Sequence, residues 1–125
     1  ILAVDRDNPR VADLYHTMHP AVLMALQNVV DAAKEADIPV SLCGELAGDP
    51  AGALLLMGMG YDSLSMNAAS LPKVKSVIRN FSLSQAQEML QQALQQPGAD
   101  GVQQVIRDNL KAAGLTRLHS RYVGN

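Results

Sequence analysis

Three short segments of this chain carry side chains that could do chemistry, and each follows an apolar stretch typical of a buried strand. They are residues 5–6, 43–45 and 65–67, which read DR, CGE and SMN. In a parallel sheet the carboxyl ends of the strands lie along one edge, where α/β proteins bind their substrates. We therefore expect these three segments to line a single pocket.

The residue types in this predicted pocket indicate an anionic substrate. Arg6 offers a planar fork of donors that suits a phosphate or a carboxylate, and Cys43, the one cysteine of the chain, supplies a thiol. Gly44 and Gly48 allow a ligand to approach the backbone closely. A helix expected to begin near Pro50 would direct its free N–H groups toward the same mouth. Together these features predict an anion site with a proton donor near the reacting carbon.

Each of these residues also has a structural explanation. A lone cysteine is often a core residue, and Arg6 can form a local ion pair with Asp5. Asp49 stands where a helix cap is expected. Glu45 is as well suited to orienting its loop as to binding a ligand, and Asn67 is typical of a turn. The residue types alone leave both interpretations open.

Two further groups of charged or metal-binding residue types are weaker candidates. His16 and His19 are three residues apart, but no further histidine or acidic partner completes a metal-ligand set, so a surface or capping role is favoured. Lys73, Lys75 and Arg79 predict a solvated basic face or, as the alternative, a surface for a partner. Neither group indicates a metal site.

The elements that must position these residues alternate between strand and helix. Apolar spacing and turn residues predict strands ending near residue 5 and over 39–43 and 63–66, and helices over 20–36, from 50 to about 58–60, and over 71–79. Capping-box spacing at Ser84–Gln87 and Asp100–Gln103 predicts two more helices, the second ending near Gly114. This alternation indicates the α/β class, with a parallel sheet and right-handed crossovers.

Composition limits the classes of partner. The chain has 125 residues, 48% hydrophobic and 18% charged, and a net charge of -2 without any block of like charge. This argues against nucleic acid or a membrane surface as the main partner. No apolar run reaches the roughly 20 residues of a membrane helix. A single cysteine fits a reducing, cytoplasmic location.

The first residues predict that the chain is part of something longer. It lacks an initiator methionine and begins in ILAV, which is already strand-like. Three parallel strands cannot close a barrel and would leave bare edges. We therefore expect the rest of the sheet to come from upstream sequence or from a second copy.

Three blocks of the sequence resemble a known family. They are Leu2–Arg6 (LAVDR), Cys43–Asp49 (CGELAGD) and Gly58–Asn67 (GMGYDSLSMN). Together they resemble the C-terminal domain of enzyme I of the phosphoenolpyruvate phosphotransferase system, over residues 1 to about 110. The stretch 18–20 (MHP) and the SMN ending at Asn67 are most similar to the nitrogen-related form of enzyme I.

This resemblance implies a fold and two site residues. Residues 1–125 would be the C-terminal part of a phosphoenolpyruvate-binding (βα)8 TIM barrel, truncated at its N-terminus, followed by C-terminal helices. By family likeness, Arg6 would hold the substrate's phosphate and Cys43 would protonate C3 of the pyruvate enolate as the phosphoryl group leaves. Thiols are mostly protonated at neutral pH, which suits a proton donor toward a carbanion-like carbon.

The resemblance also implies a cofactor and partners. The activity would be that of a phosphoenolpyruvate-protein phosphotransferase, with Mg²⁺ ligands and a phosphorylated histidine upstream of this chain. The partners would be phosphoenolpyruvate, a histidine phosphocarrier protein and a second copy in a homodimer. Because phosphoryl transfer needs metal and charge clamp together, the isolated 125 residues are predicted to be inactive. The alternatives are a relative of pyruvate phosphate dikinase or phosphoenolpyruvate synthase, or a non-catalytic dimerisation module in which Cys43 is structural.

Overall fold

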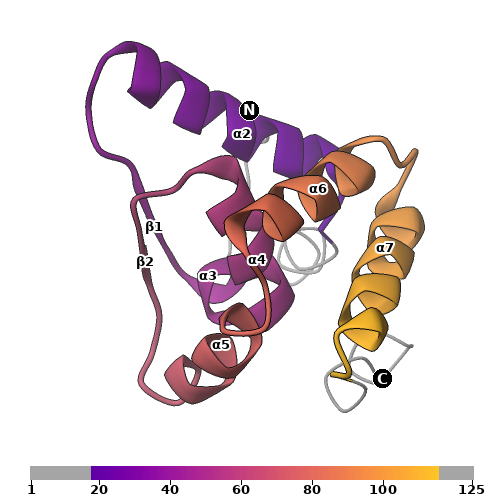
Figure 1. Ribbon diagram of the computed structural model, residues 1–125. Coiled ribbons are helices and arrows are strands. Elements are labelled where there is room, and N and C mark those ends of the chain that lie inside the picture. The colour runs from indigo at the N-terminus through magenta and orange to yellow at the C-terminus, as the bar shows by residue number, and fades with distance from the viewer. Residues whose placement is uncertain (1–17, 116–125) are drawn as a thin grey trace, which may run out of the picture.

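A computed structural model describes residues 18–115. The predicted strand ending near residue 5, Arg6 and His16 lie outside the described residues. The described part is mostly helical with a small parallel sheet, which confirms the α/β class (Figure 1). Its elements are α2 (Pro20–Glu35), β1 (Ser41–Cys43), α3 (Glu45–Gly48), α4 (Pro50–Met59), β2 (Ser63–Ser65), α5 (Leu71–Ile78), α6 (Leu83–Leu94) and α7 (Ala99–Ala112).

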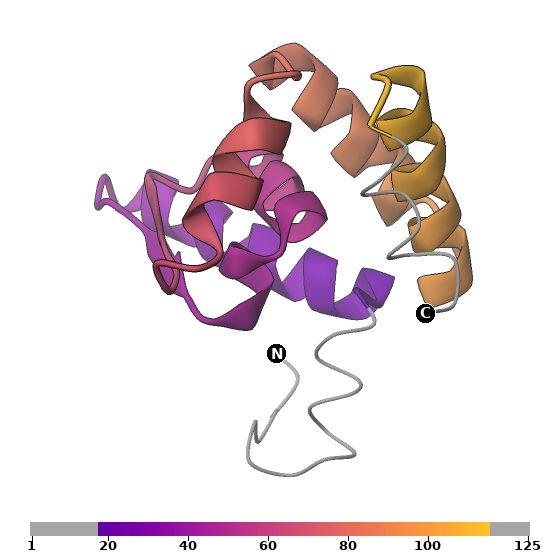
Figure 2. The same ribbon diagram turned by 90° about the horizontal axis from the view of Figure 1, so that it is seen from below.

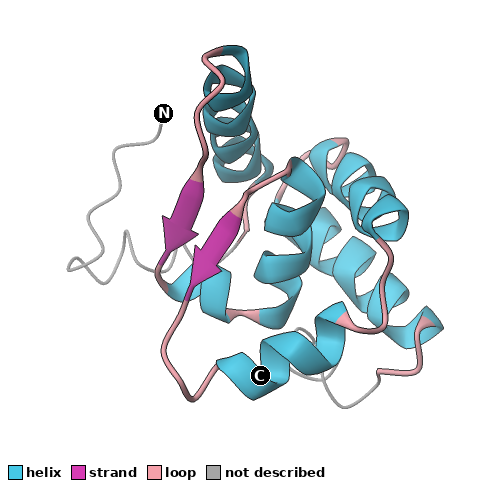
Figure 3. Cartoon of the chain, turned by 60° about the vertical axis from the view of Figure 1, so that its left-hand side comes forward, coloured by secondary structure: helices cyan, strands magenta, loops and turns pink. Residues whose placement is uncertain are grey.

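The sheet pairs β1 with β2 in parallel, as predicted, and both strands run toward the same edge (Figure 3). Leu42 and Leu64 are half-buried and pack against the core, whereas the residues on either side of them are exposed. One face of the sheet is therefore apolar and covered, and the other is polar and open. The register places the following residues opposite one another: Ser41 and Ser63, Leu42 and Leu64, Cys43 and Ser65.

Helix α4 lies at the centre of the fold, and nine of its ten residues are buried. Helices α5 and α6 pack directly on it. Gly58 permits a close approach of α6, because a Cβ there would lie 2.7 Å from the carbonyl oxygen of Ala86 on α6. In Figure 2, α6 and α7 lie side by side, at the opposite end of the molecule from the strands. The core thus holds α4 in place with its N-terminus beside the strand ends.

Most predicted boundaries are confirmed because local signals fix them. At the start of α2, Nδ1 of the N-cap His19 accepts a hydrogen bond from the Ala21 N–H at 3.0 Å, which is the capping role favoured for this histidine. The predicted start at Pro50 is also confirmed. Gly60 and Gly114 end α4 and α7 with φ values of 104° and 79°, which glycine adopts without strain.

The predicted capping box at Ser84 and Gln87 is wrong. The box is formed two residues earlier: the Ser82 hydroxyl accepts from the Gln85 N–H at 3.1 Å, and the Gln85 side chain accepts from the Ser82 N–H at 2.8 Å. The same Ser-x-x-Gln spacing occurs in both registers, so spacing alone does not separate them. The earlier register lets α6 follow directly on Phe81, which packs on the core.

The predicted capping box at Asp100 and Gln103 is also wrong. Helix α7 begins at Ala99 behind Gly98, and no side chain caps it. Asp100 lies instead within the first turn, where a carboxylate interacts favourably with the positive end of the helix dipole. The strand predicted to start at Pro39 begins two residues later, at Ser41. No described helix is long and apolar enough to cross a membrane.

Candidate functional site

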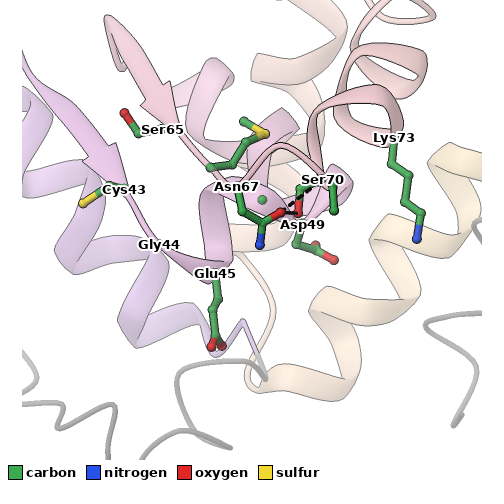
Figure 4. A pocket seen from close by; sticks show the side chains of 11 residues that line it. Cys43, Gly44, Glu45, Asp49, Ser65, Asn67, Ser70 and Lys73 are labelled. Atoms are coloured by element: carbon green, nitrogen blue, oxygen red, sulfur yellow. Dashed lines mark hydrogen bonds between the residues drawn. The ribbon is translucent and has the colours of Figure 1, made fainter.

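An open pocket of about 700 Å³ lies at the carboxyl ends of β1 and β2 (Figure 4). Its walls come from both strand ends, from α3, from the loop after β2 and from the first turn of α5. Two of the three segments predicted to converge, 43–45 and 65–67, line it together. The third segment, 5–6, lies outside the described residues, so the placement of Arg6 remains a prediction.

Cys43 is the last residue of β1 and carries a free, exposed thiol. It shares the open face of the sheet with Ser41 and stands opposite Ser65. It does not belong to the hydrophobic core that packs beneath the sheet. The thiol is therefore available to a ligand in the pocket.

Gly44 turns the chain from β1 into α3. Its backbone has φ 119° and ψ −164°, a conformation that side chains disfavour. Leu46 and Ala47 on α3 are buried and anchor the turn, while Glu45 is exposed at the pocket wall. The sequence pattern did not reveal α3 as a separate helix, because four residues are too few for a periodic signal. The turn holds Cys43 at the end of the strand.

Asp49 is the N-cap of α4, as predicted, and its Oδ2 accepts from the Gly52 N–H at 3.0 Å. Gly52 in turn lets α4 pack tightly on α3, since a Cβ at that position would collide with the carbonyl oxygen of Leu46. This close packing explains why position 52 is a glycine. Asp49, the N-cap of α4, lines the pocket.

Asn67 has the turn role that its position after a strand predicted. Its side-chain oxygen accepts from both the N–H and the hydroxyl of Ser70, each at 3.0 Å (Figure 4). These bonds close the loop that leads from β2 into α5. The Asn67 side chain thus shapes the wall of the pocket by fixing this loop.

Lys73 lines the pocket, although the sequence grouped it with Lys75 and Arg79 on a solvated face. It is the third residue of α5 and is exposed, as are the other two, which do not line the pocket. The signal that would have found it is its place in the first turn of the helix that follows a strand end. First-turn side chains lie near the edge where α/β proteins bind ligands.

Among the pocket-lining residues that the structure describes, two are acidic, Glu45 and Asp49, and one is basic, Lys73. Within residues 18–115, no cluster of three or more His, Cys, Asp or Glu side chains is placed to hold a metal ion. The described walls therefore offer a thiol, two carboxylates and one ammonium group.

Comparison with known proteins gives this arrangement a context. A family model described as "PEP-utilising enzyme, PEP-binding domain" matches residues 1–83. The chain is 44% identical, over 87% of its length, to the phosphoenolpyruvate-protein phosphotransferase of Haemophilus influenzae. It is 38% identical over 92% of its length to an Escherichia coli protein named phosphoenolpyruvate-dependent phosphotransferase system, and 44% identical over 82% to a multiphosphoryl transfer protein of Xanthomonas campestris.

The chain is short beside these relatives. It spans 19% of the Haemophilus protein, 15% of the Escherichia protein and 12% of the Xanthomonas protein. The matched regions nevertheless include both strand ends and the pocket between them, since the family model extends from residue 1 to residue 83.

Proposed function

Since the chain belongs to the PEP-utilising enzyme family and matches its PEP-binding domain, we propose that it is part of a phosphoenolpyruvate-protein phosphotransferase. In this proposal the enzyme moves the phosphoryl group of phosphoenolpyruvate to a histidine of a phosphocarrier protein, by way of a phosphohistidine elsewhere in the enzyme. The observation that carries the proposal is the exposed thiol of Cys43, held at a strand end on the wall of an open pocket.

We also propose that residues 1–125 form the C-terminal part of a (βα)8 barrel domain, with its other strands preceding them in sequence. In such a barrel every strand has two neighbours, one face looks into the barrel and the other packs on surrounding helices. The described sheet has the matching asymmetry. Leu42 and Leu64 face the helices, and the side chains at Ser41, Cys43 and Ser65 lie on the open face.

In the proposed reaction the O–P bond of phosphoenolpyruvate breaks and the phosphoryl group passes to a histidine nitrogen. The electron pair left on the enolate takes a proton at C3 from the thiol of Cys43, which gives pyruvate and a thiolate. Water then returns a proton to the sulfur. Arg6 is proposed to bind the phosphate through its planar guanidinium.

A magnesium ion is part of this proposal because phosphoryl transfer needs a charge clamp on the phosphate oxygens. The described residues do not fit a complete site for it. Asp49 is bonded to the N-terminus of α4, and residues 18–115 hold no cluster of three candidate ligands. We therefore propose that the metal ligands lie outside these residues.

Partners, location and subfamily are further parts of the proposal. We infer a homodimer, a histidine phosphocarrier partner and a cytoplasmic location, the last supported by the single free cysteine. We also propose the nitrogen-related form of the enzyme. Its support is the resemblance of residues 18–20 and 65–67, where His19 caps α2 and Asn67 fixes the loop before α5.

Replacement of Cys43 by alanine, in the full-length protein that carries this chain, tests the catalytic proposal. We expect pyruvate formation to fall by roughly 10²- to 10⁴-fold, the usual contribution of a positioned proton donor. Phosphoenolpyruvate binding should persist, because the thiol is not the anion-binding group. Calorimetry and a coupled pyruvate assay measure the two quantities.

Ser41→Ala is the matched control, because Ser41 lies on the same strand and the same exposed face but does not line the pocket. It should leave turnover close to that of the unaltered protein. Equal turnover of the Cys43→Ala and Ser41→Ala proteins would refute the catalytic role. It would favour a non-catalytic dimerisation module instead.

A further inference from the structure

Ser65 is the residue that strand pairing places beside the thiol of Cys43. The register sets these two residues opposite one another, and both are exposed on the open face of the sheet and line the pocket (Figure 4). We propose that Ser65 is a positioning residue whose hydroxyl donates a hydrogen bond to the sulfur of Cys43 as that sulfur becomes a thiolate. The effect on turnover rests on the proposed function, because it takes Cys43 as the proton donor.

The spacing of the two strands suits this contact. Neighbouring strands lie about 4.8 Å apart, and paired residues on one face stand side by side. Serine and cysteine each carry one heavy atom beyond Cβ, so rotation about χ1 moves the oxygen or the sulfur without a shift of the backbone. Buried Leu46, just after the turn at Gly44, anchors the end of β1, and Leu64 packs β2 on the core. The two side chains are thus held where their tips can meet.

The hydroxyl of Ser65 is available for this bond. Among residues 18–115, neither this hydroxyl nor the thiol of Cys43 is engaged in a hydrogen bond, so both side chains are able to rotate. The other hydroxyl on the described pocket wall, that of Ser70, already donates to Asn67. A neutral thiol is a weak partner, whereas a thiolate is a charged acceptor for an O–H donor. We therefore expect the bond to form when charge develops on the sulfur.

The bond would act on the protonation step of the proposed reaction. In that step the S–H bond of Cys43 breaks, the proton passes to C3 of the enolate, and the electron pair stays on the sulfur. The O–H group of Ser65 stabilises this negative charge and keeps its own proton. Because the bond strengthens only as the charge develops, it lowers the barrier and adds nothing to substrate affinity. Its loss should slow turnover and leave substrate binding unchanged.

Alkylation of Cys43 tests the hydrogen bond independently of turnover. Iodoacetamide reacts with the thiolate, and mass spectrometry of the peptide that contains Cys43 gives its rate across a pH series in the full-length protein that carries this chain. Ser65→Ala should move the midpoint of this pH series upward by roughly 0.5–1 unit, which is about three- to tenfold less thiolate at a given lower pH. Ser65→Thr keeps the hydroxyl on a residue that suits a strand, and it should restore the midpoint of the unaltered protein.

Ser63→Ala is the matched control, because it removes a hydroxyl from the same strand and the same exposed face. Ser63 lies roughly 6.6 Å back along β2, pairs with Ser41 and does not line the pocket. Equal midpoints for Ser65→Ala and Ser63→Ala would overturn the inference, and so would a Ser65→Thr protein that behaves like Ser65→Ala. The charged side chains of the described pocket wall are the same in every variant: Glu45 on α3, Asp49 at the N-cap of α4 and Lys73 on α5.

Turnover separates this inference from the proposed function. In Ser65→Ala, kcat for pyruvate formation should fall about three- to tenfold with KM unchanged, and a raised KM with unchanged kcat would overturn the positioning role. If Cys43→Ala forms pyruvate at the normal rate, the proposed function is refuted, although a shifted alkylation midpoint would still establish the hydrogen bond. If Cys43→Ala is impaired and Ser65→Ala matches Ser63→Ala in both measurements, the proposed function stands and only the role of Ser65 is refuted.

Discussion

The core around α4 and the edge formed by the strand ends differ in how far their side chains are buried. On α4, Leu54, Leu55 and Leu56 are fully buried, and no polar or charged side chain is buried anywhere in the described residues. At the strand ends, Cys43, Ser65 and Asn67 are exposed around an open pocket. The residues that form the core and the residues that line the pocket are therefore different.

Substitutions in the two regions should therefore change different measured quantities. A change in the core should lower the free energy of unfolding and leave the affinity of the folded protein unaltered. A change at the strand ends should alter affinity or turnover more than stability. The following variants of the full-length protein test that separation, from the largest expected effect on stability to the smallest.

Leu55→Ala should have the largest effect, because it leaves a cavity in the centre of the fold. Leu55 is fully buried on α4, and such a truncation typically costs about 2–5 kcal/mol. Denaturant titration measures the loss. Calorimetry on the folded variant should show unchanged phosphoenolpyruvate affinity, and a large fall in that affinity would contradict the separation.

Gly58→Ala should destabilise the protein by about 1–3 kcal/mol, because the new methyl group meets the Ala86 carbonyl and overpacks the contact between α4 and α6. The gain in helix propensity, about 1 kcal/mol, offsets part of this cost. Denaturant titration checks the sign. A variant more stable than the unaltered protein would mean that α6 moves away without penalty.

Gly44→Ala should lower both stability and turnover. An alanine at φ 119° is strained by about 1–3 kcal/mol, and relief of that strain would shift the adjoining Cys43. We therefore expect turnover to fall by more than the loss of stability explains. Pyruvate formation, measured where the variant is fully folded, decides this. Normal turnover would show that the turn does not position the thiol.

Gly98→Ser should have the smallest effect and the opposite sign. Gly98 is the N-cap of α7, has an extended backbone, and a Cβ there would meet nothing within 4 Å. A serine hydroxyl can accept from the first-turn N–H groups, which adds up to a few tenths of a kcal/mol over glycine. Thermal unfolding should show a small rise in midpoint, with pyruvate formation unchanged. A fall in midpoint would mean that the serine does not cap α7.

The strand ends could be predicted from sequence because their signals are local. Apolar runs that stop at Cys43 and Asn67 identify the edge, and a cap followed by proline identifies the start of α4 at Asp49. Parallel pairing then follows from the alternation of strand and helix. The proximity of residues 43–45 and 65–67 was predictable from topology alone.

Other features depend on packing that the sequence does not display. Ser82 and Ser84 each have a glutamine three residues later, so spacing alone does not identify Ser82 as the cap. Residue-type preference places a lone cysteine in the core, whereas strand pairing places Cys43 on the open face. The sequence does not distinguish Lys73 from Lys75. In the fold, Lys73 lies in the first turn of α5, which follows β2, and it lines the pocket, whereas Lys75 does not.

The open face of the sheet has a consequence for hydration. Ser41, Cys43, Ser63 and Ser65 form two facing pairs of small side chains, all exposed. Hydroxyl groups in such a row can bind water next to the sulfur. In the proposed reaction, a thiolate at Cys43 would take its proton back from this water, and that step should slow in heavy water.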